Sequence, residues 1–314
     1  MLQQTRVATV LPYFRRFLTR FPDVRSLAAA RAGDVMATWA GLGYYARARN
    51  LHACARVVVQ RHAGRFPRTA QELAQLPGLG ASTAAAIAAF CFNERAAVLD
   101  ANARRVLARH WAIAGDLSRG PAHERLLERA CIELPEARRM ADYTQAIMDL
   151  GASVCTKVQP ACALCPVGST CRANREGRIG ELPAVRPRGE RPVRRVHVLL
   201  ALAQRKVALQ RRPAGGIWGG LLCFPQFESK AALLRSASAL GAALQPRISP
   251  APRMHALTHL TLALQPHVAI IRAAVQGAGR DAQWQWVCLD RIGSAGLPAP
   301  HRELVRELRD ELRG

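Results

Sequence analysis

The chain has 314 residues, of which 50% are hydrophobic, and its 45 basic and 22 acidic side chains give a formal net charge of +23. This length is enough for two domains with separate cores. The sequence shows neither an apolar run long enough to cross a bilayer nor a signal peptide, so it argues against an integral membrane protein and predicts a cytoplasmic one.

The charge indicates a polyanionic partner, most simply a nucleic acid. Only Lys157, Lys206 and Lys230 are lysines, so nearly all the basic residues are arginines. A genome-wide preference for arginine would explain this choice of base, but not the twofold excess of base over acid. Aromatic residues make up only 5% of the chain, which argues against a stacking platform for single strands. The sequence therefore favours binding to the backbone of a duplex.

The first half of the chain has the three- and four-residue apolar spacing that predicts helices. Pro12 should kink or restart the first helix, and Ser82 or Thr83 should cap the fourth. Thr69 and Glu72 have the spacing of a capping box at the start of the third. The predicted helices cover residues 7–21, 46–62, 69–76, 82–90, 101–110 and 142–154.

The second half begins with a change in amino-acid composition. Residues 177–194 are rich in proline, glycine and arginine and have no periodicity, which predicts a linker. Beyond it the spacing is that of strands, with a hairpin turn at 204–206. The predicted strands cover 196–203, 207–210, 260–271 and 284–289, and two further helices cover 230–240 and 300–312. The expected fold is a mainly α N-terminal region, residues 1–176, followed by the linker and a smaller α+β domain, residues 195–314.

Four cysteines lie close together in the chain, with gaps of six, two and five residues: Cys155, Cys162, Cys165 and Cys171. Thiolates at this density favour zinc or an iron–sulfur cluster over four ordinary buried cysteines. A zinc ribbon usually has two Cys-x-x-Cys pairs, and only Cys162 and Cys165 form one, so the spacing favours a single 4Fe–4S cluster. The other cysteines are predicted to be reduced core residues: Cys54, Cys91, Cys131, Cys223 and Cys288.

The segment Leu76-Pro77-Gly78-Leu79-Gly80 lies between two short predicted helices and has the form of a helix–hairpin–helix turn. Its glycines let the backbone turn tightly and expose N–H groups at a helix start, where they can hold a DNA phosphate without reading sequence. An ordinary helix–helix turn explains the same five residues equally well. The basic charge and the cysteine cluster favour phosphate binding.

Asp100 precedes a predicted helix, and helix capping alone explains an aspartate at this position. The functional interpretation is a carboxylate that faces a cavity and stabilises positive charge developing on a sugar. The turn around Gly41, Gly43 and Tyr44 also has two interpretations. Its tyrosines pack in the core, or one of them wedges into a base stack.

The chain resembles the adenine DNA glycosylases of the MutY type, in the endonuclease III superfamily. The resemblance is carried by the cysteine spacing, Leu-Pro-Gly-Leu-Gly, the segment 41–50, Leu-Asp-Ala-Asn at 99–102 and the opening Met-Leu-Gln-Gln-Thr, and it extends to the C-terminal helix. It implies an enzyme that flips adenine mispaired with 8-oxoguanine or guanine out of double-stranded DNA and hydrolyses its N-glycosidic bond. It also implies a monomer in the bacterial cytosol or nucleoid, with a structural 4Fe–4S cluster and no membrane partner.

The resemblance assigns roles to individual residues. Asp100, with Asn102 nearby, would stabilise the oxocarbenium-like sugar. Tyr44 would wedge beside 8-oxoguanine, and Gln4 would fill space near the vacated stack. The implied DNA-binding residues are Gln3, Gln4, Tyr44, Gly78, Gly80 and Ser82, and the implied lesion-recognition turn is Leu257, Thr258 and His259.

The sequence differs from related enzymes at two places, and each difference leads to a prediction. Ser82 stands where endonuclease III-like lyases have a lysine that forms a Schiff base, which implies a monofunctional glycosylase. The C-terminal domain is similar to the family's Nudix-related module, but residues 230–240 contain no carboxylate, which predicts no Mg²⁺-dependent hydrolysis. The turn Leu257-Thr258-His259 lacks the aromatic residue of the family's Phe-Ser-His turn.

The resemblance places the family's catalytic glutamate two residues before the methionine that corresponds to Met1. Glu72 and Glu94 lie in no matching motif, because a helix cap explains the first and a loop the second. Two hypotheses follow: an enzyme whose reading frame starts further upstream, or a lesion-binding protein without catalysis. A relative specific for thymine or oxidised pyrimidines is a third, and the second domain and Ser82 argue against the latter specificity.

Overall fold

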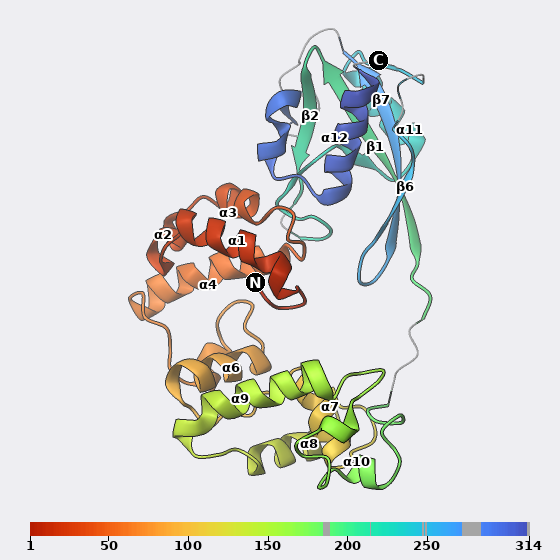
Figure 1. Cartoon of the computed structure of the whole chain (residues 1–314). Helices are drawn as coiled ribbons and strands as arrows, with labels where there is room; N and C mark the ends of the chain where they lie inside the picture. Colours follow the sequence, from red (N-terminus) through yellow and green to blue (C-terminus); the bar gives the residue numbers. More distant parts are fainter. Residues whose placement is uncertain (185–188, 214, 247, 249, 272–283, 313–314) are drawn as a thin grey trace. The chain divides into compact units, whose positions relative to one another are not determined.

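The computed structural model describes residues 1–184, 189–213, 215–246, 248, 250–271 and 284–312 (Figure 1). It separates into two compact units, one of Met1–Arg56 with Gly189–Gly314 and the other of Val57–Arg188. The first unit therefore combines residues that the sequence assigns to the N-terminal region and to the C-terminal domain. The domain boundaries at 176/177 and 194/195 stay a prediction, and the linker residues 185–188 lie outside the described part.

Four helices begin the chain: α1 (Val7–Arg20), α2 (Val24–Ala29), α3 (Ala32–Trp39) and α4 (Ala46–His62). Helix α1 continues through Pro12, so the predicted restart there is wrong. Val10 and Phe17 lie on either side of the proline in the chain, and both are buried in one core. Packing of both turns outweighs the one backbone N–H that the proline removes.

The C-terminal part of the first unit is a mixed sheet flanked by two α-helices, with a 3-10 helix before the second. Its strands are β1 (Val193–Ala203), β2 (Lys206–Arg211), β3 (Leu222–Cys223), β4 (Gln226–Phe227), β5 (Ala243–Leu244), β6 (Arg253–Ala256), β7 (Thr261–Ile270) and β8 (Trp284–Cys288), and its helices are α11 (Lys230–Ala239), the 3-10 helix η4 (Leu289–Ala295) and α12 (Ala299–Glu311). The main strand order is β3-β2-β1-β7-β5, with β4, β6 and β8 paired to β1, β7 and β2. The predicted hairpin is confirmed by antiparallel β1 and β2, whereas β1 and β7 run parallel.

Residues 198–203 of strand β1 are buried on both faces, which explains their unbroken apolar sequence. Alternate side chains of a strand point to opposite faces. Val198 and Leu200 share one core with Leu304 of α12, while Leu199 shares the other with Leu233 of α11. The sheet is therefore the middle layer between two helices.

The second unit is helical. Its elements are α5 (Ala70–Leu73), α6 (Ala81–Phe92), α7 (Ala101–His110), α8 (Pro121–Ile132), the 3-10 helix η1 (Ala137–Arg139), α9 (Met140–Asp149), the π-helix η2 (Leu150–Val154), the 3-10 helix η3 (Cys162–Leu164) and α10 (Arg172–Arg175). Leu107 of α7 and Leu126 of α8 belong to its larger core. Gly80 caps α6 without a side-chain bond. The predicted cap at Ser82 or Thr83 is wrong, because both residues lie inside the first turn.

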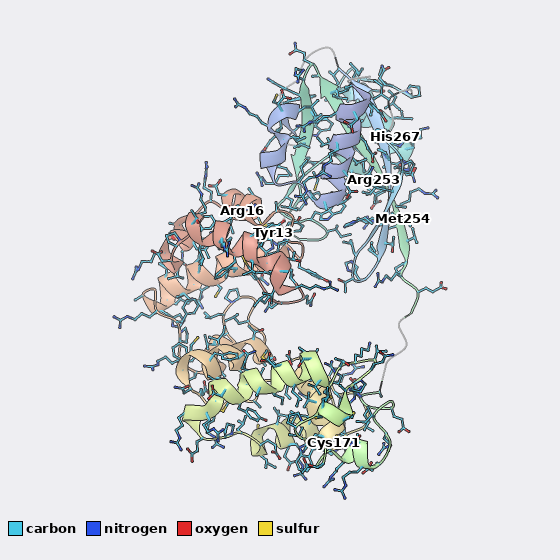
Figure 2. All side chains as sticks on the ribbon, in the orientation of Figure 1. Tyr13, Arg16, Cys171, Arg253, Met254 and His267 are labelled. Atoms are coloured by element: carbon cyan, nitrogen blue, oxygen red, sulfur yellow. The ribbon has the colours of Figure 1, made fainter. Side chains whose placement is uncertain are left out.

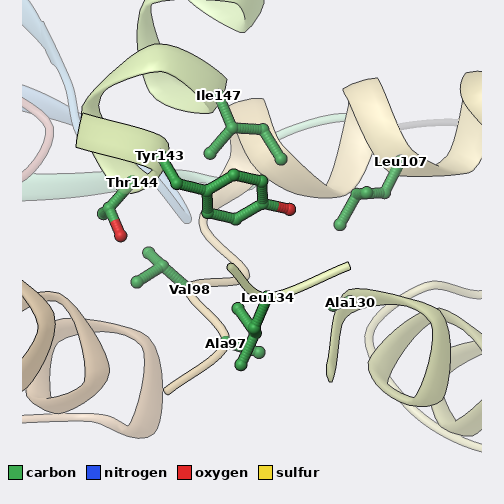
Figure 3. Close-up of a pocket in the computed structure, with 8 residues that line it drawn as sticks. All are labelled: Ala97, Val98, Leu107, Ala130, Leu134, Tyr143, Thr144 and Ile147. Carbon is green, nitrogen blue, oxygen red and sulfur yellow. The ribbon is translucent and has the colours of Figure 1, made fainter. Parts of the chain in front are cut away.

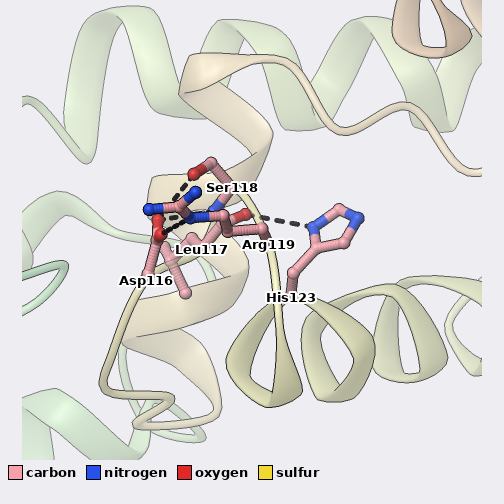
Figure 4. Close-up of polar contacts among 5 residues, drawn as sticks. All are labelled: Asp116, Leu117, Ser118, Arg119 and His123. Atoms are coloured by element: carbon pink, nitrogen blue, oxygen red, sulfur yellow. Dashed lines mark hydrogen bonds and ion pairs between the residues drawn. The ribbon is translucent and has the colours of Figure 1, made fainter.

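The connection between α7 and α8 is ordered by Asp116 (Figure 4). Its carboxylate accepts hydrogen bonds from the backbone N of Ser118 at 3.0 Å, from Ser118 Oγ at 2.6 Å and from Arg119 Nε at 3.2 Å. The carbonyl oxygen of Leu117 lies 3.1 Å from His123 Nδ1, in the first turn of α8. The contacts of Asp116 with Ser118 make an Asx-type turn, and α8 begins two residues after Arg119 with Pro121 at its first position.

The cysteines outside the 155–171 segment only partly follow their prediction. Cys54 and Cys223 are buried, but Cys91 and Cys131 are exposed and Cys288 is intermediate. The core prediction is therefore wrong for Cys91 and Cys131, because both lie on the outer faces of helices whose buried faces use other residues. Among the helices that the structure describes, none is both long and apolar enough to cross a membrane.

His301 of α12 is fully buried and uncharged in the first unit. Its Nδ1 accepts from the backbone N of Phe224 at 3.0 Å, and its ring packs against Trp218 and Phe224. Burial first, and then the nearby charges of Arg212, His255 and Arg253, lower the pKa of His301 from 6.5 to about 3. The unfolded chain therefore binds a proton more readily than the folded chain between these two pH values.

This burial predicts that the first unit loses stability as the pH falls from 6.5 towards 3. From pH 7 to pH 4 the free energy of unfolding should fall by about 3 kcal/mol on account of His301. Urea unfolding followed by tryptophan fluorescence reports on this unit, because four of the five tryptophans lie in it. His301→Gln should flatten the pH dependence, whereas the exposed control His259→Gln should leave it unchanged; equal slopes in all three proteins would contradict the assignment.

Candidate functional site

The predicted helix–hairpin–helix turn joins α5 to α6 in the second unit. Thr69 Oγ1 accepts from the backbone N of Glu72 at 3.3 Å and so starts α5. Gly78 has a φ of +80°, a left-handed conformation that favours glycine. Gly78 and Gly80 are both exposed, and no side chain caps the first turn of α6. The N–H groups at this helix start therefore face outward, where an anion can accept from them.

Asp100 caps helix α7, as predicted. Its Oδ1 accepts a hydrogen bond from the backbone N of Ala103 at 2.7 Å. Asp100 is only partly buried, and Asn102 follows it in the first turn. The cap fixes the carboxylate at a helix N-terminus, so capping and a chemical role are compatible.

Arg105, which sequence reasoning missed, joins the start of α7 to the cysteine segment. One of its terminal nitrogens donates to Asn102 Oδ1 at 2.9 Å and to the carbonyl oxygen of Gly151 at 2.6 Å. Its Nε donates to the carbonyl oxygen of Cys155 at 2.7 Å. Burial lowers the pKa of Arg105, and the nearby Cys155 opposes this shift. One guanidinium thus holds Asn102, the π-helix and the first cysteine together.

Gly151, in the π-helix turn η2, touches the backbone of α7. A Cβ at this position would lie 2.7 Å from the Cβ of Asn102 and 3.1 Å from its Cα and carbonyl carbon. Only glycine permits this approach, because backbone atoms cannot move aside as a flexible side chain would. The approach places η2 directly against the first turn of α7.

We expect Gly151→Ala to push the first turn of α7 away from η2. Overpacking of this kind costs about 1–3 kcal/mol, and the same shift should weaken the Arg105 contact with Asn102. The free energy of unfolding in urea and the rate of base excision should both fall. Gly180→Ala is the matched control, since a Cβ there meets nothing within 4 Å. Equal behaviour of the two variants would contradict a role for the close approach.

The four cysteines of the 155–171 segment line one pocket in the second unit. Arg109 of α7 is 3% exposed and lies beside it. Its guanidinium donates to Cys155 Sγ at 3.4 Å and to the carbonyl oxygens of Thr156 and Leu182, each at 2.7 Å. Cys171 is the most buried of the four thiols, and burial raises its pKa. Figure 2 labels Cys171 in this segment.

Four thiol side chains that line one pocket match the donor type that an iron–sulfur cluster requires. In the described part of the chain, no three His, Cys, Asp or Glu side chains are placed to hold one metal ion. Gly168 lies inside the segment and packs closely in it, since a Cβ there would lie 3.1 Å from the carbonyl oxygen of Cys165 and 3.2 Å from that of Cys162.

A second pocket in this unit is lined by Ala97, Val98, Leu107, Ala130, Leu134, Tyr143, Thr144 and Ile147 (Figure 3). Its lining is apolar apart from the tyrosine and the threonine, and burial raises the pKa of Tyr143. It contains none of the predicted site residues, so it is better explained as a packing defect beneath α7 than as a reaction site.

Gln3, Gln4 and Tyr44 lie in the first unit. All three are exposed, Tyr44 by 48%. Gln4 and Tyr44 have φ values of +58° and +48°, a left-handed conformation that costs a non-glycine residue about 1–3 kcal/mol. Strain of this kind persists only where surrounding contacts enforce it.

The predicted lesion-recognition turn closes the hairpin between β6 and β7. The backbone N of Leu257 donates to the carbonyl oxygen of Leu260 at 2.8 Å, and Thr258 and His259 are exposed at the tip. Arg253 at the base of this hairpin (Figure 2) pairs with Glu303 of α12 at 3.0 Å and with Glu307. Its side chain is only 15% exposed, so this pairing anchors the hairpin to α12.

The structure thus groups the predicted residues in two sets. Asp100, Asn102 and the cysteine segment share the second unit with the glycine hairpin, while Gln3, Gln4, Tyr44 and the turn at 257–259 belong to the first. Sequence reasoning missed Arg105, Arg109 and Gly151. Arg105 and Arg109 are four residues apart on the helix that Asp100 caps, and this spacing puts them on one face, which is the only signal the sequence offered.

Comparison with known proteins identifies both regions. Residues 1–132 match the HhH-GPD superfamily of base excision DNA repair proteins, and residues 197–307 match the NUDIX domain. The chain is 31% identical to an adenine DNA glycosylase of Buchnera aphidicola over 98% of its own length and 87% of the relative's. It is 30% identical to that of Rattus norvegicus, over 100% and 71% of the two chains.

A solved structure adds support for the fold. It is a thermostable thymine-DNA glycosylase with a TM-score of 0.50 and 26% identity, covering 56% of this chain and 80% of that one. The expected fold class, a helix–hairpin–helix glycosylase region with a Nudix-like domain, is confirmed. From these matches over nearly its whole length, the chain belongs to the adenine DNA glycosylase family of base-excision repair enzymes.

Proposed function

We propose that this DNA glycosylase removes adenine paired with 8-oxoguanine or guanine in double-stranded DNA, and that it leaves an intact abasic site. The observation that carries the proposal is Asp100, a carboxylate fixed at the start of α7 by the N–H of Ala103 and flanked by an Asn102 that Arg105 holds. Hydrolysis of an N-glycosidic bond develops positive charge on the sugar, which a fixed carboxylate stabilises.

The proposed reaction has three steps: the base leaves the stack, the glycosidic bond breaks, and water adds to the sugar. Adenine flips out of the duplex into a pocket. Departure of the base generates the oxocarbenium-like sugar, and Asp100 stabilises it while water adds. Asn102 is a polar neighbour whose orientation Arg105 fixes. Phosphates of the strand accept from the N–H groups at Gly80 and the first turn of α6, which holds the duplex without reading its sequence.

The general acid that protonates adenine is not assigned to a residue of this chain. Glu72 is engaged with its own cap, Thr69 Oγ1, at 2.7 Å, and Glu94 accepts from the backbone N of Ala70 at 2.6 Å. Both glutamates thus support α5. This observation keeps the second candidate function in place, a protein that binds the lesion without cutting.

A 4Fe–4S cluster bound by Cys155, Cys162, Cys165 and Cys171 belongs to the proposal. It would supply a rigid cross-link of the segment and no bond cleavage. Arg105 and Arg109 bind the carbonyl oxygens of residues 155 and 156, so the order of this segment bears on the position of α7. The protein is proposed to act as a monomer.

Recognition of 8-oxoguanine is assigned to the exposed tip at Thr258 and His259, with Leu257 in place of an aromatic residue. Gln3, Gln4 and Tyr44 are assigned to the base stack. Helix α11 contains no carboxylate, which supports recognition rather than Mg²⁺-dependent hydrolysis as the role of the Nudix-like domain.

Ser82 predicts a monofunctional reaction. A serine cannot form a Schiff base, and the nearest lysine in the sequence is Lys157. Borohydride reduction of the protein with a duplex that contains an abasic site should therefore trap no covalent adduct, while a lyase treated in parallel is trapped. A trapped adduct with this chain would assign it a lyase step.

Single-turnover excision separates the two candidate functions. The chain is incubated in excess with a duplex that contains adenine opposite 8-oxoguanine, and alkali then cleaves abasic sites. Strand cleavage together with tight binding supports the glycosylase. Tight, mispair-selective binding with no cleavage supports the lesion-binding protein, and the absence of both overturns the proposal.

A further inference from the structure

One guanidinium connects two turns in the first unit that are separate in sequence. Arg47, in the first turn of α4, donates to the carbonyl oxygen of Met1 at 2.7 Å, to that of Gln3, and to Thr5 Oγ1 at 2.9 Å. It also reaches the carbonyl oxygen of Gly43 at 3.4 Å. The N-terminal turn and the turn before α4 therefore share one hydrogen-bonding centre.

The two residues with strained backbone in these turns each follow a carbonyl that Arg47 holds. Gln4, at a φ of +58°, follows the carbonyl of Gln3, and Tyr44, at +48°, follows that of Gly43. A hydrogen bond to the preceding carbonyl restricts rotation of the peptide plane at which the strained residue begins. Arg47 thus supplies the contacts that such strain requires.

The same guanidinium also orders the side chain of Tyr44. Its central carbon lies 5.2 Å from the centre of the Tyr44 ring and 5.4 Å from that of Trp39, both within the range of a cation–π contact. Trp39 is 1% exposed, and its Nε1 donates to the carbonyl oxygen of Gly43 at 3.1 Å. The Tyr44 ring therefore contacts Arg47 while the residue stays 48% exposed, so that it can meet another aromatic surface.

The chemistry of this centre requires arginine. Within the described residues every hydrogen-bond acceptor of Arg47 is neutral, and burial lowers its pKa. A partly buried charge without a carboxylate partner lacks the electrostatic stabilisation that an ion pair supplies. Arginine suits this centre because its planar fork spreads five N–H donors over three nitrogens, whereas the three N–H donors of lysine diverge from a single nitrogen.

We propose that Arg47 is a positioning residue that locks the turns carrying Gln4 and Tyr44 into one rigid element for entering the base stack of a duplex. The proposal rests on the proposed function, because it takes Gln4 and Tyr44 to be the residues that enter the DNA. If Gln4 and Tyr44 already have their bound arrangement in the free protein, less conformational entropy is lost on binding.

A double-mutant cycle on DNA binding tests this role. Dissociation constants are measured by fluorescence anisotropy for a duplex with adenine opposite 8-oxoguanine and for a matched duplex. Tyr44→Ala should reduce the preference for the mispaired duplex roughly tenfold, the value of one stacking contact. Arg47→Lys should reduce it by a similar factor, and the double variant should fall clearly short of the product of the two single effects, because part of the effect of Arg47 passes through the tyrosine.

Arg49→Lys is the matched control on the same helix. Arg49 donates instead to the carbonyl oxygen of Gly219 at 2.7 Å, so its replacement should leave the preference unchanged. A merely structural role for Arg47 predicts the opposite pattern, in which Arg47→Lys weakens matched and mispaired binding equally or adds its full effect to that of Tyr44→Ala. Either result overturns the inference.

The binding data distinguish failure of the proposed function from failure of the inference about Arg47. If the wild-type chain shows no preference for the mispaired duplex, the proposed function fails and the inference with it. If wild type shows the preference but the cycle is additive, only the inference fails. Should Arg47→Lys not fold, Thr5→Val replaces it in the same cycle, because it removes one acceptor of Arg47 and leaves the guanidinium in place; non-additivity with Tyr44→Ala supports the role, and additivity overturns it.

Discussion

Asp100→Asn is expected to lower the rate of adenine excision by about a hundred- to a thousandfold, the cost of removing one preorganised electrostatic group. Asparagine caps a helix about as well as aspartate, and its side-chain oxygen can still accept from the backbone N of Ala103. The variant therefore removes the negative charge and keeps the local fold. Single-turnover rates and urea unfolding, measured on the same preparations, separate the two effects.

Asp23→Asn is the matched control for this prediction. Asp23 caps α2 in the same way, with its Oδ1 accepting from the backbone N of Ser26 at 2.7 Å, but it lies in none of the predicted sites. Its variant should keep the wild-type rate. A wild-type rate for Asp100→Asn would show that the aspartate is a helix cap and nothing more.

Cys171→Ser is expected to lower the iron bound per chain by about tenfold or more, because a serine hydroxyl is a poor ligand for the soft metal site that four thiolates form. Cys171 is 8% exposed and packs with Ala173 and Leu182. Loss of the bound group should therefore also destabilise the second unit. Metal analysis gives the iron content, and the thermal midpoint of the purified protein gives the change in stability.

Cys91→Ser serves as its control, because Cys91 is an exposed cysteine of the same unit outside the 155–171 segment. It should keep its iron and its thermal midpoint. Full iron content in Cys171→Ser, or an equal loss in both variants, would contradict the assignment of the cluster to this segment.

Much of the local structure could be predicted from the sequence. The cap at Asp100 and the bounds of α7 follow from a good N-cap residue before a periodic segment, and the hairpin of β1 and β2 follows from two apolar runs around a polar turn. These elements depend on neighbours in sequence. The short helices α2 and α3 gave too few turns for a periodic signal.

The contacts that place the candidate site could not be predicted, because they join distant parts of the chain. Arg105 reaches a carbonyl 50 residues away at Cys155, and Arg47 reaches one 46 residues away at Met1. The spacing of Arg105 from Arg109 predicts that both lie on one face of α7, but not what that face contacts, and nothing in the local sequence distinguishes Arg47. The close approach at Gly151 could not be predicted either, because this glycine differs from others only in the atoms that a Cβ would meet in the folded chain.

The most direct measurement is the identity of the base that the chain releases from DNA. Duplexes that place each normal base opposite 8-oxoguanine, and adenine opposite guanine, are incubated with excess protein, and the free bases are identified by mass spectrometry. The account predicts free adenine from the duplexes with adenine opposite 8-oxoguanine or guanine, and no other base from any duplex. Release of thymine or another pyrimidine, or of no base at all, would contradict it.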